Sequence, residues 1–150
     1  MITEDYVSFE TAKLLKEKGF DEPVRMYFKV NNYPSDTTIQ NIKKATGKDM
    51  EQIEVNSLFN TEDEPFFNSV EGKDENLFAY PTLQMTMKWL RDIHNFDIIA
   101  YPQFDDSKWT YFAIIFKLSF PYTQIKLNDN KDKKEDAYED AIKYCLKNWI

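Results

Sequence analysis

The chain has 150 residues, of which 42% are hydrophobic and 16% aromatic, so it can form the core of one folded domain. Its single cysteine excludes an intramolecular disulfide, and one cysteine with one histidine excludes the usual zinc motifs. The three glycines belong to no phosphate-binding motif, and the net charge of −7 argues against general binding to duplex nucleic acid. We therefore expect no metal and no cofactor.

The N-terminal part of the chain predicts a helix followed by a strand. The helix is expected near residues 9–18, with Ser8 as its N-cap and Gly19 at its end. Residues 24–30 alternate between apolar and polar side chains, which is typical of a strand with one buried face. The other face of this strand carries Arg25, Tyr27 and Lys29.

Residues 31–76 differ in composition from the rest of the chain, and we interpret them as an acidic insertion. They include one short predicted helix near residues 37–46, followed by a long run without a regular pattern. Residues 35–80 hold 4 basic and 10 acidic side chains, whereas residues 81–150 hold 10 of each. The acidic residues include the triplet Glu62, Asp63 and Glu64.

The C-terminal half predicts a helix, a hairpin and a second helix. The first helix is expected near residues 83–94, where Thr82 is placed to cap it. Two strands near residues 96–118 are joined by the polar turn "DDS", and "TQIKL" predicts a short third strand. The last helix is expected near residues 135–149, where apolar residues recur at helical spacing.

The single histidine and the single cysteine are the first residues to test for chemistry. His94 falls in the last turn of a predicted helix, where the helix dipole favours a protonated imidazole, and Asn95 after it is a natural C-terminal stop. Cys145 falls on the apolar face of the last helix, which predicts a buried thiol. We interpret both residues as structural, and we expect no enzymatic activity because no catalytic motif is present.

This order of elements predicts an α+β fold in a single domain that covers residues 1–150. We expect one small, mainly antiparallel sheet, made of the strand at 24–30 and the hairpin, with the three helices packed against one face. The segment 31–76 would then be an insertion into this domain.

Three blocks of the sequence are similar to blocks of other small proteins: "YVSFETAKLLKEKGFDEP", "YPTLQMTMKWLRDIHN" and "AYEDAIKYCLKNWI". Together they resemble small proteins of unknown function encoded by phages, prophages and mobile elements of gut Bacteroidetes. The resemblance covers roughly residues 6–30 and 80–150, and it excludes the acidic segment. It implies a phage or prophage origin and action in a bacterial cell, but no activity and no site residues.

The hairpin is the most promising binding surface in the sequence. We expect one row of its side chains to face the helices, namely Phe112, Ile114, Phe116 and Leu118. The opposite row, with Trp109, Tyr111 and Ile115, would then face outward together with Tyr101. Arg25, Tyr27 and Lys29 share this face if their strand joins the same sheet. Either this aromatic face is exposed, or the insertion or a second subunit of a dimer covers it.

We predict a non-enzymatic phage-type accessory protein that binds a host or phage protein. In one version of this hypothesis, the acidic segment mimics a phosphate backbone and occupies a basic groove of its partner. The alternative is a module in which the aromatic hairpin face stacks the bases of single-stranded nucleic acid. No apolar run is long enough to span a membrane and the N-terminus does not resemble a signal peptide, so we expect the protein in the bacterial cytoplasm.

Overall fold

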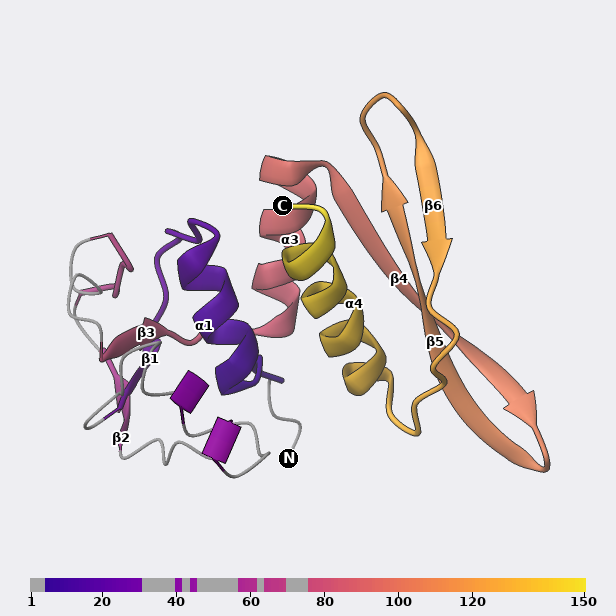
Figure 1. The fold of residues 1–150 in the computed structure, drawn as a ribbon, viewed down its shortest axis with the longest axis horizontal. Helices are drawn as coiled ribbons and strands as arrows, with labels where there is room; N and C mark the ends of the chain where they lie inside the picture. The colour runs from indigo at the N-terminus through magenta and orange to yellow at the C-terminus, as the bar shows by residue number, and fades with distance from the viewer. Residues whose placement is uncertain (1–4, 31–39, 42–43, 46–56, 62–63, 70–75) are drawn as a thin grey trace. The chain divides into compact units, whose positions relative to one another are not determined.

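The computed structural model describes residues 5–30, 40–41, 44–45, 57–61, 64–69 and 76–150, with backbone only for 57–60. The chain forms two compact units. The terminal unit consists of Met1–Phe20 and Pro81–Ile150, and the middle unit is Asp21–Tyr80. The predicted α+β class is confirmed, because the described residues form helices and two antiparallel sheets (Figure 1).

The terminal unit contains three of the four predicted helices. They are α1 (Phe9–Glu17), α3 (Leu83–His94) and α4 (Lys134–Asn148), each within a residue or two of the predicted bounds. The hydroxyl of Ser8 accepts a hydrogen bond from the Thr11 amide at 3.2 Å and caps α1. Thr82 caps α3 in the same way. Local sequence chemistry therefore sets where these helices begin.

Both predicted ends of helices are also confirmed. Gly19 follows α1 with φ +87°, a backbone conformation that glycine adopts without the steric cost of a Cβ. Asn95 ends α3 in the left-handed conformation, with φ 60°, and its amide donates back to the carbonyl of Arg91. The sharp stop at Asn95 lets a strand begin at the next residue.

The terminal unit also contains an antiparallel sheet with the strand order β4-β5-β6. The long strands β4 (Phe96–Asp105) and β5 (Lys108–Lys117) form the predicted hairpin, and β6 (Thr123–Lys126) is the predicted short third strand. The hairpin turn consists of Asp106 and Ser107, which have φ 48° and 61°. Two consecutive positive φ values match the type I′ turn that fits the twist of a two-residue hairpin.

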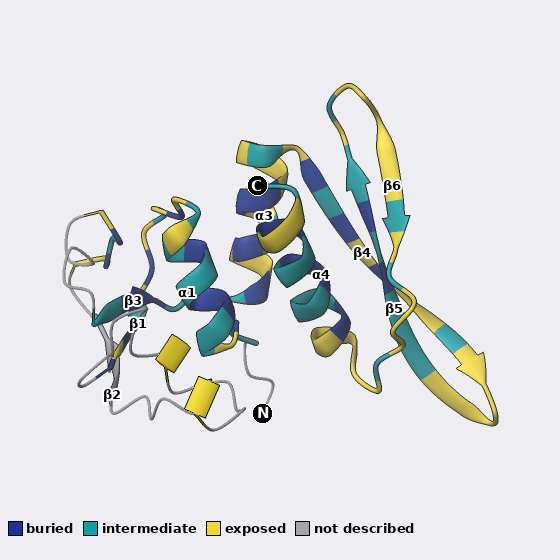
Figure 2. Ribbon diagram, in the orientation of Figure 1, coloured by how far each residue is buried: buried dark blue, intermediate teal, exposed yellow. Residues whose placement is uncertain are grey.

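Helices α3 and α4 pack against one face of this sheet (Figures 1 and 2). The buried residues on that face are Phe96, Ile98 and Ala100 of β4 and Ala113 and Ile115 of β5. The small side chains of Ala100 and Ala113 are paired across the two strands, which allows a helix to approach the sheet closely. The helices and this face form the core of the terminal unit.

The predicted phase of β5 is wrong by one residue. Phe112, Ile114 and Phe116 were expected to face the helices, but the buried residues of the strand are Ala113 and Ile115, which are 2% and 0% exposed. The run "YFAIIF" is apolar in both phases, so alternation in the sequence could not separate its two faces. The buried row is the one that places a small alanine beneath the helices.

The middle unit has a sheet of its own, with β1 (Met26–Lys29) at its centre. β2 (Ser57–Asn60) and β3 (Leu77–Ala79) pair with β1 on either side, both antiparallel. The strand predicted at 24–30 is therefore present, but it does not belong to the sheet of the hairpin. We did not predict β2 and β3, because strands of three or four residues are too short to show alternation.

The buried side chains of the middle unit come from segments far apart in its sequence. They are Val24, Phe28, Val30, Phe66, Asn68, Phe78 and Ala79. The amide of Ala79 donates to the buried side-chain oxygen of Asn68 at 3.0 Å, which satisfies both groups away from water. The compact unit therefore starts ten residues before the predicted insertion, includes β1 and ends at Tyr80. Of the helix predicted at 37–46, only residues 40–41 and 44–45 are described, and they are helical.

Candidate interaction surface

The three aromatic residues predicted on the hairpin do not share a face. Side chains that are directly paired across strands lie on the same side of a sheet, and successive residues alternate. Tyr101 is paired with Phe112 and lies on the face opposite the helices. Trp109 and Tyr111 lie on the helix-facing side, in the same row as the buried Ala113. The predicted aromatic surface is therefore divided between two faces.

The predicted basic and aromatic residues of the first strand lie in the sheet of the middle unit. Arg25 and Lys29 are exposed on or next to β1, as the alternation predicted. Tyr27 is half-buried, and its ring stacks on Phe66 with centroids 4.6 Å apart and an interplanar angle of 12°. Tyr27 is thus part of the packing of its own unit.

The acidic triplet is described only in part. Glu62 and Asp63 lie outside the described residues, and Glu64 is exposed. The residues 21–80 that form the middle unit carry 6 basic and 12 acidic side chains, so the unit has a net charge of −6. The terminal unit accounts for the remaining −1.

The end of the β4–β5 hairpin presents two large aromatic side chains to solvent. We call residues 104–109 the hairpin tip. Phe104 and Trp109 are paired across the strands, with ring centroids 5.2 Å apart, and they are 60% and 58% exposed. Their side chains are on the helix-facing side of the sheet, but this end of the hairpin extends beyond the helices (Figure 2). Sequence reasoning selected Trp109 and missed Phe104, although a two-residue turn predicts that the two pair.

The charged groups of the hairpin tip are mostly acidic. Asp105 and Asp106 are exposed, and the ammonium group of Lys108 lies 2.6 Å from the carboxylate of Asp132. Lys108 is therefore already paired with an acid. The tip combines a contiguous aromatic patch with an acidic border.

The opposite face of the sheet carries a second apolar surface, which we call the outer face. Its members are Ile99, Tyr101, Phe112, Ile114 and Phe116. The rings of Tyr101 and Phe112 stack with centroids 5.6 Å apart, and the ammonium group of Lys126 lies 4.4 Å above the Phe112 ring. No helix of the described residues packs on this side of the sheet.

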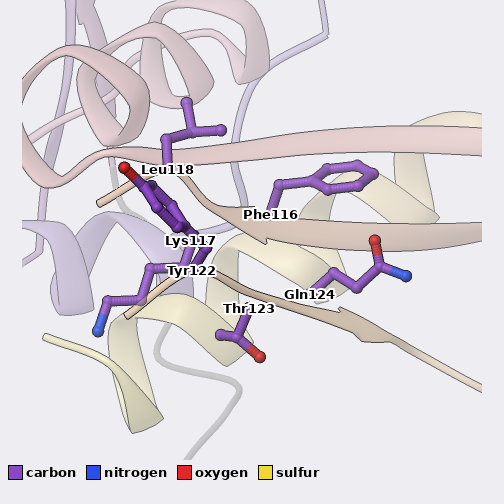
Figure 3. A pocket seen from close by; sticks show the side chains of 6 residues that line it. All are labelled: Phe116, Lys117, Leu118, Tyr122, Thr123 and Gln124. Atoms are coloured by element: carbon purple, nitrogen blue, oxygen red, sulfur yellow. The ribbon is translucent and has the colours of Figure 1, made fainter. Parts of the chain in front are cut away.

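The end of the sheet where β5 leads to β6 has an open hollow of about 510 Å³ (Figure 3). The side chains that line it are Phe116, Lys117, Leu118, Tyr122, Thr123 and Gln124. Tyr122 is 75% exposed, and its ring meets that of Phe120, which is 85% exposed, with centroids 6.2 Å apart. Most of the surface that lines the hollow is apolar, although Lys117, Tyr122, Thr123 and Gln124 also carry polar groups.

His94 is packed between aromatic rings, as a structural residue. Its ring meets Trp89 edge-on with centroids 4.7 Å apart and lies parallel to Phe96 at 6.5 Å. Burial lowers the pKa of His94 below its ordinary value of 6.5. We expected the helix dipole to favour the protonated form, but the loss of hydration outweighs that effect.

Cys145 is completely buried on α4, as predicted. Burial raises the pKa of its thiol to about 12, so the thiolate that a nucleophile requires does not form near neutral pH. Within the described ranges, no three side chains of His, Cys, Asp or Glu come close enough together to hold a metal ion.

Comparison of the chain with protein-family models, with curated proteins and with solved structures finds no match. Among the described residues, no helix has both the length and the apolar character that crossing a lipid bilayer requires. The hairpin tip and the outer face are two surfaces of the described residues that expose large apolar side chains and could bind another molecule.

Proposed function

We propose that this chain is a non-enzymatic accessory protein that binds a protein partner through its hairpin tip. The observation that carries the proposal is the pair of adjacent aromatic side chains, Phe104 and Trp109, each more than half exposed at the end of a hairpin whose strands have ten residues each. Exposing this much aromatic surface is unfavourable in water unless another molecule covers it. Tryptophan is also among the residues that contribute most to protein–protein affinity.

The backbone at the tip supports the same proposal. Asp106 and Ser107 both adopt positive φ, which is unusual for residues other than glycine. Such conformations cost free energy and are concentrated at functional sites. The turn holds the two aromatic side chains at a fixed position across the strands.

A protein partner fits the tip better than single-stranded nucleic acid. A nucleic-acid surface combines stacking side chains with unpaired cations that contact phosphates. Here Asp105 and Asp106 lie beside the aromatic pair, and Lys108 is bound to Asp132. The acidic border favours a partner with basic groups around an apolar pocket.

The cellular setting of the proposal comes from the resemblance to proteins of phages, prophages and mobile elements. We infer from it that the chain acts in the cytoplasm of a bacterial host cell, where its partner would be a host or phage protein. The acidic middle unit, with its net charge of −6, would add long-range attraction to a basic partner.

Affinity purification of the tagged full chain from its bacterial host tests the proposal. Trp109→Ala should lower recovery of the partner by more than tenfold, because loss of a central tryptophan typically costs about 2 kcal/mol or more. The matched control is Phe120→Ala, which removes an exposed aromatic side chain from the other end of the same sheet. This control should leave recovery unchanged.

Equal recovery with Trp109→Ala and with the unchanged chain would rule out the hairpin tip as the contact. A titration of the full chain with a labelled single strand at about 50 mM salt tests the alternative class, because phosphate contacts are strongest at low salt. Binding there that Trp109→Ala abolishes would replace the protein partner with nucleic acid.

A further inference from the structure

The outer face has the composition of a buried layer. Two consecutive rows across the strands pair apolar side chains, Tyr101 with Phe112 and Ile99 with Ile114, and the next row adds Phe116 opposite Asp97. Ile99 and Tyr101 are each 37% exposed, although both lie in the middle of a strand. Alternating strands normally present polar residues on the face that meets water, so this face is suited to a covering partner.

The outer face is large enough for a weak dimer. Its length is that of the ten residue pairs of β4 and β5, and three strands set its width. The chain after β6 continues the third strand position of the sheet, because Leu127 and Lys131 also form backbone hydrogen bonds to β5. At about 3.4 Å per residue and about 4.8 Å per strand, the face covers about 500 Å². Two such faces would bury about 1,000 Å², near the lower limit for specific association.

Two opposite charges lie on opposite edges of the outer face, at the end of the sheet away from the hairpin tip. The β4 edge carries Asp97 and the β6 edge carries Lys126. Asp97 and Lys126 lie in adjacent rows, because Asp97 is level with Gln124. At the tip, Asp105 is paired across the strands with Lys108, which also forms an ion pair with Asp132. The part of the face away from the tip therefore has an acidic edge and a basic edge on either side of an apolar centre.

This arrangement is complementary to itself under one kind of two-fold axis. An axis parallel to the strands exchanges the edges, so β4 of one copy lies over β6 of the other and Asp97 of each copy comes within one row of Lys126 of the other. An axis perpendicular to the strands would instead lay β4 over β4 and bring the acids together. Self-complementarity about a two-fold axis is the requirement for a symmetric dimer.

We propose that the outer face binds a second copy of this chain, face to face, about a two-fold axis parallel to the strands. The two sheets form the middle layers of the dimer, and the helices of each copy form its outer layers. This proposal does not depend on the proposed function, because the aromatic side chains of the hairpin tip lie on the opposite face of the sheet. A dimer would present two tips to the partner.

The oligomeric state of the full chain tests the proposal. Light scattering at concentrations from about 1 to about 200 µM should show a mass that rises from 17.9 kDa toward twice that value, as expected for an affinity near the micromolar range. Ile99→Lys should weaken the dimer by at least tenfold, because it places a cation in the apolar centre. Ile93→Lys is the matched control, since Ile93 is an exposed isoleucine on α3, and it should leave the dimer intact.

Charge reversal tests the direction of the axis. Asp97→Lys and Lys126→Asp should each weaken the dimer, and the double reversal should restore it. The proposal would be overturned if the chain stays monomeric at every concentration. It would also be overturned if Ile93→Lys weakens the dimer as much as Ile99→Lys does. Failure of the double reversal to restore the dimer would overturn the proposed axis. A thermal transition measured for every variant separates loss of association from loss of folding.

Discussion

At the scale of single residues, the pKa of His94 depends on two opposing effects, the helix dipole and burial. The C-terminus of α3 favours a protonated imidazole, while the rings of Trp89 and Phe96 remove water from it. Burial dominates, so the pKa of His94 is lowered. The sequence placed this residue correctly in the last turn, but its aromatic neighbours include Phe96, whose position depends on the strand that follows.

A proton NMR titration should find the midpoint of the single histidine below 6.5 in the folded chain. The unfolded chain then binds a proton at a pH where the folded chain does not. Stability should therefore be complete above pH 6.5 and decrease as the pH falls from 6.5 through the lower folded value. His94→Phe should remove this part of the pH dependence. A histidine midpoint above 6.5 would show that the helix dipole dominates.

At the scale of elements, α1 is joined to α4 by hydrogen bonds between residues far apart in the sequence. No local sequence pattern predicts them. One oxygen of Glu139 accepts from the amide and hydroxyl of Ser8 and from the hydroxyl of Thr11. Thr11 is completely buried, and its hydroxyl donates to this carboxylate and accepts from the hydroxyl of Ser8 at 3.2 Å. Glu10 adds exposed ion pairs with Lys143 and Lys147, each at 3.0 Å. Exposed pairs of this kind contribute little, so Glu139 is the important contact.

Glu139→Ala should lower the free energy of unfolding by about 2–3 kcal/mol, because it leaves the buried Thr11 hydroxyl without its acceptor. Glu135→Ala, on the exposed first turn of the same helix, should cost about 0.5 kcal/mol through the helix dipole alone. Urea denaturation of both variants measures the difference. Equal costs would mean that water replaces the carboxylate without loss.

Elements with local signals were predicted well from the sequence. The capping residues Ser8 and Thr82, the stop at Asn95 and the two-residue turn all act within four residues, and each was confirmed or nearly so. The short strands β2 and β3 depend on pairing with β1, and the phase of β5 depends on the helices above it. Such contacts between distant segments leave no periodic pattern in the sequence, which is why they were missed. For the same reason the predicted hairpin surface contained the right strands and the wrong combination of faces.

At the scale of the whole molecule, the terminal unit packs the two segments where the chain leaves it and returns to it. The amide of Val7 donates to the carbonyl of Pro81 at 3.1 Å, and Phe20 packs edge-on against Trp89 at 5.3 Å. The chain therefore leaves the terminal unit after Phe20 and returns at Pro81. Closing such a loop depends weakly on its length, about 0.6 kcal/mol per doubling.

Replacing residues 21–80 with a short Gly/Ser linker should therefore leave a terminal unit with a single cooperative thermal transition. Replacing residues 35–76 instead should give a less stable, aggregating protein, because it keeps β1 but removes β2 and Phe66. Calorimetry and light scattering of the two variants distinguish these outcomes. Loss of the transition in the 21–80 replacement would mean that the terminal unit requires the middle unit to fold.

The fastening of α1 to α4 also sets an order of events during synthesis on the ribosome. Ser8 leaves the exit tunnel early, but its partner Glu139 follows 131 residues later. At about 5–20 residues per second, α1 waits on the order of ten seconds for its carboxylate. All strands of the middle unit emerge during that interval. The middle unit of the nascent chain can therefore fold while α1 still exposes its apolar face to chaperones.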